Sequence, residues 1–158
     1  MLAVDQRPPV NAVIAETLGS AEAPLDEVQR VKRLLIDRLA PAASAVLVDP
    51  VTAFCGSDRI SPRQGMIMTL EDSTFEATAD GRLTSTIDEL SVDKIKRSGA
   101  DGGKFLAWYR PDAGSGVLAH QQAIVAEVGA ACERADIPFI LELLLYPFPA
   151  ERPDQVPS

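Results

Sequence analysis

A single lysine lies inside an otherwise apolar run, residues 102–109, that is short enough to be a buried strand. Because side chains alternate between the two faces of a strand, Lys104 shares its face with Leu106 and Trp108. Burial among such groups disfavours the charged form of the amine. A desolvated amine is a nucleophile for carbonyl groups, whereas a lysine at a strand end often extends its amine to solvent. Lys104 is therefore a candidate catalytic residue, with a structural alternative.

A second apolar run, residues 138–145, holds one carboxylate, Glu142, among leucine and isoleucine side chains. It follows the first run by about one βα unit, so the two runs are expected to be successive strands of one sheet. We therefore expect a buried cation at Lys104 and a buried anion at Glu142 that share a site. The alternative is a carboxylate that only pairs with Lys104 or with a helix terminus.

Three further predicted strands end in polar residues. In α/β proteins the carboxyl ends of parallel strands border the ligand crevice, so these residues are candidate ligand contacts. They are Asp5 and Gln6 after residues 2–4, Asp49 after residues 44–48, and Glu71 with Asp72 after residues 66–70. Asp5 and Asp49 would serve equally well as N-caps of the elements that follow them.

The five predicted strands are separated by segments with helical periodicity or by loops. Helices are expected over residues 10–18, 25–39, 87–97 and 117–135. The second is expected to pack Leu25 and Leu39 and to keep Lys32 on its polar face, and Gly99 is expected to end the third. Residues 73–82 are expected to form a loop with a turn at Asp80-Gly81. This alternation indicates an α/β fold with a parallel sheet. Three architectures fit: an open five-stranded sheet, a flavodoxin-like sheet with crossovers on both faces, and the first part of a (β/α)8 barrel.

Composition limits the classes of function. The 158 residues are 46% hydrophobic and carry a formal net charge of −8, which argues against a nucleic-acid surface. The basic cluster at Lys94, Lys96 and Arg97 is expected to be a solvated helix face. Cys55 and Cys132 show no disulfide or zinc spacing, so both are expected to be reduced thiols. No apolar run reaches the length of a membrane span, so a cytoplasmic protein is the default expectation.

Five segments together resemble the tagatose-1,6-bisphosphate aldolases, class I aldolases of the DeoC/LacD type, and their sulfosugar-phosphate relatives. The segments are LAVDQR at 2–7, VLVDP at 46–50, SVDKIK at 91–96, GADGGKFL at 99–106 and IPFILE at 137–142. The resemblance implies a TIM-barrel fold, here a partial barrel of about five βα units over residues 1–146. Residues 147–158 are then a proline-rich tail or a truncated loop.

The resemblance also implies an activity. The family cleaves a ketose bisphosphate through a lysine Schiff base, without a metal or other cofactor, which would make this chain a lyase of carbohydrate metabolism in the tagatose 6-phosphate route. By resemblance, Lys104 is the charge beside the Schiff-base site and Glu142 moves protons during carbon–carbon cleavage. Asp5 and Gln6 correspond to a pair that touches the phosphorylated sugar, with Asp49 and Glu71 as weaker candidates.

Two departures from the family pattern matter. The family's Schiff-base lysine lies on a sixth strand, and the sequence ends sixteen residues after Glu142, so we expect no catalysis by this chain alone. Asp72 stands where relatives usually carry lysine. The alternative function is a non-catalytic α/β module that binds a phosphorylated metabolite or a partner chain, and unpaired edges of the first and fifth strands favour a homo-oligomer. His120, the only histidine, is expected to be a surface or packing residue.

Overall fold

The computed structural model describes residues 1–148 and 151. Contacts divide the chain into two compact units. The first consists of Met1–Thr69 and Ile95–Gly102, and the second of Leu70–Lys94 and the chain from Gly103 onward. The proline-rich segment predicted over 147–158 lies mostly outside the described residues.

Three parallel strands form the sheet of the first unit. β1 (Leu2–Ala3) pairs with β2 (Ala45–Val48), and β2 pairs with β3 (Gly65–Thr69). A flavodoxin-like sheet would place the first strand between the second and third, whereas here β2 occupies that place. The flavodoxin-like alternative is therefore wrong. Val46 and Val48 on one face of β2 are completely buried and Leu47 on the other face is 4% exposed, as expected for a strand covered on both faces.

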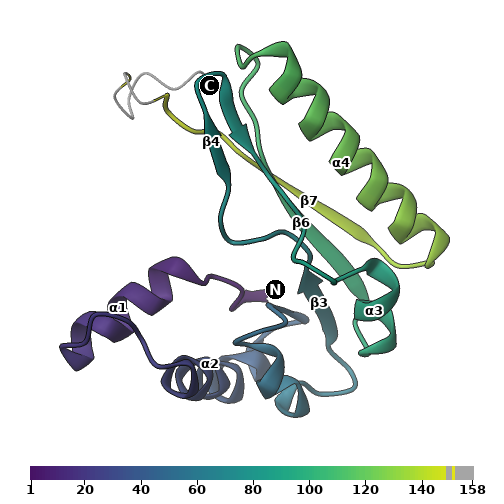
Figure 1. The fold of residues 1–158 in the computed structure, drawn as a ribbon. Coiled ribbons are helices and arrows are strands. Elements are labelled where there is room, and N and C mark those ends of the chain that lie inside the picture. Colours follow the sequence, from purple (N-terminus) through teal and green to yellow (C-terminus); the bar gives the residue numbers. More distant parts are fainter. Residues whose placement is uncertain (149–150, 152–158) are drawn as a thin grey trace. The chain divides into compact units, whose positions relative to one another are not determined.

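Two helices and two short 3-10 segments accompany these strands. α1 (Pro8–Leu18) begins with proline at its first positions and ends at Gly19, whose φ of 63° is left-handed. α2 (Leu25–Leu39) lies next to α1 (Figure 1). The 3-10 segments are η1 (Ala40–Ala42) and η2 (Phe54–Arg59), and η2 packs against α2.

The buried face of α2 differs from the predicted one. Its buried residues are Val28, Lys32 and Ile36, at four-residue spacing, whereas Leu25 and Leu39 are about half exposed. The sequence pattern assigned Lys32 to the solvated face. The assignment was wrong because the lysine has a buried partner, described below.

A parallel pair and a long helix form most of the second unit. β6 (Gly102–Trp108) pairs with β7 (Phe139–Leu144), and α4 (Ser115–Arg134) runs alongside them (Figure 1). Buried residues of α4 include Val117, Val128 and Cys132. These boundaries agree with the predicted helix and strands.

The predicted loop over 73–82 is instead a hairpin. β4 (Glu76–Thr78) pairs antiparallel with β5 (Gly81–Leu83), and Asp80 lies in the predicted turn. Each strand is only three residues long, too short to show an alternating pattern in the sequence.

The predicted helix over 87–97 is shorter than expected. α3 covers Val92–Arg97, and its chain belongs partly to each unit. Glu89 has a positive φ of 58°, which is incompatible with an earlier start, and the Ser91 hydroxyl accepts a hydrogen bond from the Lys94 amide. Gly99 has a φ of 91°, as predicted for the residue that ends this helix.

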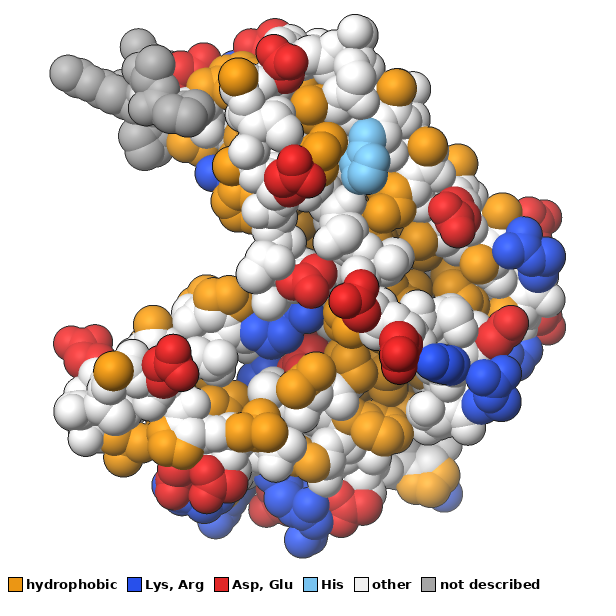
Figure 2. Space-filling model, in the orientation of Figure 1, with side chains coloured by type: hydrophobic (Ala, Val, Ile, Leu, Met, Phe, Trp, Pro, Cys, Tyr) orange, Lys and Arg blue, Asp and Glu red, His pale blue; other side chains and the backbone are white. Residues whose placement is uncertain are grey.

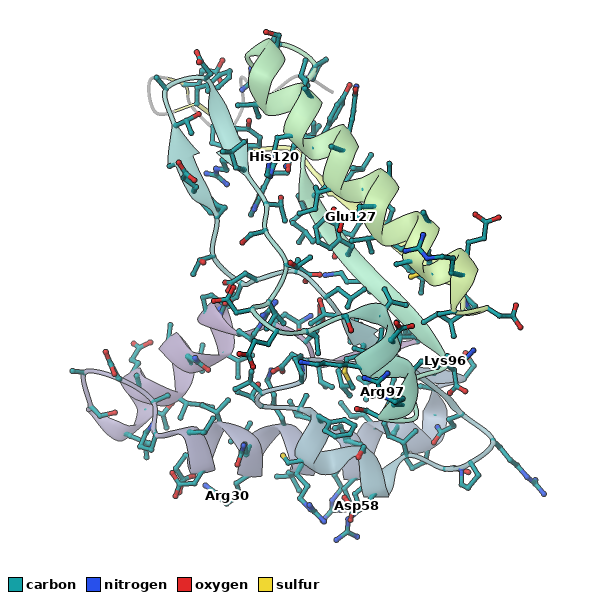
Figure 3. The ribbon with its side chains drawn as sticks, turned by 45° about the vertical axis from the view of Figure 1, so that its right-hand side comes forward. Arg30, Asp58, Lys96, Arg97, His120 and Glu127 are labelled. Atoms are coloured by element: carbon teal, nitrogen blue, oxygen red, sulfur yellow. The ribbon has the colours of Figure 1, made fainter. Side chains whose placement is uncertain are left out.

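Charged side chains of both signs are mixed on the surface. On the face drawn in Figure 2, blue and red side chains lie next to one another. The three basic residues of α3 are exposed, as predicted, and Figure 3 shows Lys96 and Arg97 on the outside of the helix. Within residues 1–148 and 151, no helix has the length and hydropathy needed to cross a membrane.

Candidate active site

The second unit contains a buried lysine with two carboxylate partners. Lys104 is 2% exposed, and its Nζ lies 2.9 Å from Glu71 Oε1 and 2.9 Å from Glu142 Oε2. Leu106 is the β6 partner of Glu142 in the strand register, so residues 104 and 142 point to the same side of the pair. The predicted meeting of the amine and the acid is therefore observed, and the desolvated ammonium is compensated by negative charge.

Two backbone contacts with β6 hold Glu71 in place. The Leu70 amide donates to the Lys104 carbonyl at 2.9 Å, which fixes the chain beside β6. Glu71 Oε2 accepts the Leu106 amide at 3.1 Å, and the carboxylate is 3% exposed. Sequence analysis placed Glu71 among the weaker candidates for substrate contact, because its position after a strand does not predict a contact with Lys104.

Glu142 is not the buried anion that the sequence predicted. Its side chain is 45% exposed although it touches a buried amine. β7 pairs with β6 alone among the described residues, and its neighbours Leu141 and Leu143 are also exposed. The apolar run suggested a covered strand, but α4 contacts this strand from one side only. Glu142 is therefore accessible to solvent or to a ligand while it remains paired with Lys104.

Asp5, Gln6 and Asp49 belong to the first unit. Asp5 is buried directly after β1, whose pairing extends through the Val4 amide to the Leu47 carbonyl at 2.9 Å. Gln6, the next residue, is exposed. These two positions match the predicted end of the first strand.

Asp49 is completely buried and accepts four hydrogen bonds. Oδ2 lies 2.6 Å from Lys32 Nζ and 2.6 Å from the Thr52 hydroxyl, while Oδ1 accepts the amides of Val51 and Thr52. Lys32 itself is 1% exposed. The contacts fit the N-cap alternative and leave little room for a ligand. Lys32 was missed, and its only sequence signal is its spacing between Val28 and Ile36.

A third buried cation, Arg110, was also not predicted from the sequence. Arg110 is 1% exposed, forms a bidentate pair with Asp112 at 2.8 and 2.6 Å, and bonds Glu151. The guanidinium holds the pKa of Asp112 and the pKa of Glu151 below their usual values. Its partners Asp112 and Glu151 come from a loop and from the segment after β7, so no local sequence pattern predicts that these three residues meet.

A polar network ties the hairpin to α4 and β6. Gln121 accepts the Thr84 amide at 3.1 Å and donates to the Trp108 carbonyl at 2.6 Å. Figure 3 shows His120 on the side of α4 that faces the hairpin, and its Nε2 lies 2.9 Å from the Thr84 carbonyl. His120 is exposed, as predicted. In the described part of the chain, no group of three or more His, Cys, Asp and Glu side chains is arranged to hold a metal ion.

The sequence model of the DeoC/LacD family aldolases matches residues 1–156. The chain belongs to the DeoC/LacD family of aldolases. Two similar curated proteins are tagatose 1,6-diphosphate aldolases 2 and 1 of Streptococcus pyogenes serotype M3. Each is 33% identical over 145 residues, which is 92% of this chain and 44% of the relative. The chain therefore spans less than half the length of these relatives.

Solved structures of aldolases share the fold. An archaeal fructose 1,6-bisphosphate aldolase superposes with a TM-score of 0.52 at 14% identity, over 89% of this chain and 49% of the other. A Schiff-base-forming fructose-1,6-bisphosphate aldolase gives the same TM-score at 15% identity. The fold of this DeoC/LacD chain is a partial (β/α) barrel, as predicted.

Proposed function

We propose that this DeoC/LacD chain contributes to a class I aldolase that cleaves a ketose bisphosphate, of the tagatose-1,6-bisphosphate type, into dihydroxyacetone phosphate and an aldehyde. The similarity to the two streptococcal aldolases supports the substrate class. The observation that carries the proposal is the Lys104 ammonium, paired with one buried and one half-exposed carboxylate. Such a group binds substrate oxygens and lies next to a proton acceptor.

The three residues of this cluster have different proposed roles. Lys104 holds a substrate oxygen and, as a nearby cation, favours the neutral form of a separate imine-forming amine. Glu142 accepts and returns a proton, because it is the exposed member. Glu71 positions Lys104, because it is buried and fixed by the Leu106 amide. An ammonium held by two carboxylates has no lone pair for attack, so Lys104 is not proposed as the imine-forming lysine.

Asp5 and Gln6 are proposed to contact the substrate, since both follow β1 at its carboxyl end. Asp49 is proposed to act indirectly, by fixing the end of β2 through Lys32 and Thr52. Because Lys104 is the assisting lysine in this proposal, the 158 residues alone are not expected to cleave substrate.

Reductive trapping tests the proposed role of Lys104. The chain is incubated with dihydroxyacetone phosphate and borohydride, and the mass of each lysine-containing peptide is measured by mass spectrometry. We expect no adduct on Lys104. A covalent adduct there would overturn it, because the residue would then be the nucleophile.

Ligand binding tests the substrate class. Calorimetry with tagatose 1,6-bisphosphate is expected to show binding by the chain and at least about tenfold weaker binding by Lys104→Met, since a charge-assisted hydrogen bond contributes about 1.5–3 kcal/mol. Lys94→Met removes the same charge from the exposed face of α3 and is expected to bind normally. Equal binding by both variants would remove Lys104 from the site.

A second candidate function is association between copies of this chain. Leu143 of β7 is 55% exposed, and Leu145, directly after this strand, is 44% exposed. An apolar groove of about 160 Å³ between α4 and the strands is lined by Trp108, Leu118 and Leu143. Strand edges with exposed apolar side chains pair readily with other chains. Sedimentation is expected to give a mass that is a multiple of 16.9 kDa. Leu143→Lys is expected to reduce this mass to that of one chain, whereas Leu34→Lys, at an exposed leucine of α2, is expected to leave it unchanged. A wild-type chain that sediments as a monomer would exclude this candidate.

A further inference from the structure

Three aromatic rings surround the guanidinium of Arg82, on β5 of the hairpin. Its Cζ lies 4.2 Å from the ring centre of Phe75, 4.6 Å from that of Trp108 and 4.8 Å from that of Tyr146. Each distance is within the range of a cation–π interaction. Burial among the rings lowers the pKa of Arg82 from its usual value. The rings therefore hold the position of the cation without neutralising it.

The N–H groups of the Arg82 guanidinium have no hydrogen-bond acceptor in the described part of the chain. An arginine side chain has five N–H groups that donate in the plane of the guanidinium, and aromatic faces offer no acceptor in that plane. Arg82 forms no side-chain hydrogen bond and no salt bridge with the described residues. The buried Arg110, by contrast, donates to two carboxylates and to the Tyr146 carbonyl.

The surrounding fold fixes Arg82 in place before any ligand arrives. The Arg82 amide donates to the Tyr146 hydroxyl at 3.0 Å. A side chain at Gly81, where φ is +142°, would come within 2.5 Å of the same hydroxyl, so this close approach requires glycine. The Thr84 hydroxyl accepts the Trp108 amide at 3.2 Å, which joins the hairpin to β6. A preorganised cation loses little conformational entropy when it binds an anion.

We propose that Arg82 is an oxyanion-binding residue that takes a phosphate group in the plane of its guanidinium, with Phe75, Trp108 and Tyr146 as its frame. Phosphate matches the forked arrangement of these donors. Trp108 lies on the same face of β6 as Lys104 but four residues later, about 13 Å further along the strand at about 3.3 Å per residue. The site is therefore separate from the lysine and its carboxylates, and the inference does not depend on the proposed aldolase activity.

Tryptophan fluorescence provides the test, because Trp108 is the only tryptophan and contacts Arg82 directly. The chain is titrated with inorganic phosphate and with glycerol 3-phosphate, and the same samples are followed by the width of the phosphorus NMR line. A saturable change is expected in the wild type, with at least about tenfold weaker binding in Arg82→Gln. Arg97→Gln, which removes an exposed arginine of α3, is expected to bind as the wild type does.

Two results would overturn the proposal: no saturable response in the wild type by either method, or equal affinity in Arg82→Gln and wild type. If circular dichroism shows that Arg82→Gln does not fold, Arg82→Lys replaces it. This variant keeps the positive charge but loses the planar, forked arrangement of donors, so we expect several-fold weaker phosphate binding. Unchanged binding would refute the proposal. Tighter binding of glycerol 3-phosphate than of phosphate identifies a phosphate ester as the ligand, and equal binding identifies free phosphate.

Discussion

The substitution Glu71→Gln distinguishes the contribution of Glu71 from that of Glu142, the other carboxylate that pairs with Lys104. Glu71 accepts the Lys104 ammonium through one oxygen and the Leu106 amide through the other. Glutamine has a single oxygen, so in either orientation its amide nitrogen faces one of these two donors. The variant also leaves the buried ammonium with Glu142 as its remaining carboxylate partner among the interactions described above, and Glu142 is 45% exposed.

The expected cost follows from burial. Removing one partner of a buried ion pair costs about 3–5 kcal/mol, and because Glu142 remains we expect about 3 kcal/mol for Glu71→Gln. The matched variant Glu142→Gln removes an exposed partner and is expected to cost about 0.5–1 kcal/mol. Folded domains are stable by only about 5–15 kcal/mol, so the first change is large and the second is small.

Urea unfolding followed by circular dichroism measures the difference. With a slope of about 2 kcal/mol/M, the midpoint is expected to fall by about 1.5 M in Glu71→Gln and by less than about 0.5 M in Glu142→Gln. Equal shifts, or a larger shift in Glu142→Gln, would refute the assignment of Glu71 as the buried partner that holds Lys104.

Three further predictions concern the surroundings of this cluster. Arg110 lowers the pKa of Asp112 from 3.8 and the pKa of Glu151 from 4.5. The two pairs therefore stabilise the folded chain above these values, and this stabilisation is lost as the pH falls through the pKa values of the folded state. Arg110→Gln removes both pairs, so it is expected to reduce the loss of Tm between pH 7 and pH 3. An unchanged loss would contradict this. Gly81→Ala is expected to lower Tm, since the new methyl meets the Tyr146 hydroxyl at a positive φ, whereas Gly116→Ala in open space on α4 is expected to leave Tm unchanged or raise it. A thiol reagent is expected to label exposed Cys55 but not buried Cys132, whose pKa burial raises, so mass spectrometry of the native chain should show one adduct and not two.

The sequence predicted the elements whose residues carry a regular pattern. The strands around Val48, Ile67 and Phe105 are short apolar runs, and α4 (Ser115–Arg134) lies close to its predicted range of 117–135, because burial of apolar side chains selects both. The contact between Lys104 and Glu142 also followed from two charges at matching places in successive strands.

The remaining features depend on partners that are distant in the sequence. Lys32 is buried because Asp49 lies seventeen positions later, and Arg110 is buried because Glu151 follows β7. The three aromatic rings around Arg82 come from a loop, from β6 and from the segment after β7. Local periodicity records none of these pairings, since each partner looks like an ordinary surface or core residue by itself.

A crystal structure of the chain with dihydroxyacetone phosphate would test the role of Lys104 most directly. We expect a carbonyl or hydroxyl oxygen of the ligand about 2.7–3.1 Å from Lys104 Nζ, with Glu142 in contact with the same ligand. A ligand bound without any contact to Lys104, or joined covalently to it, would contradict the proposed role of this lysine.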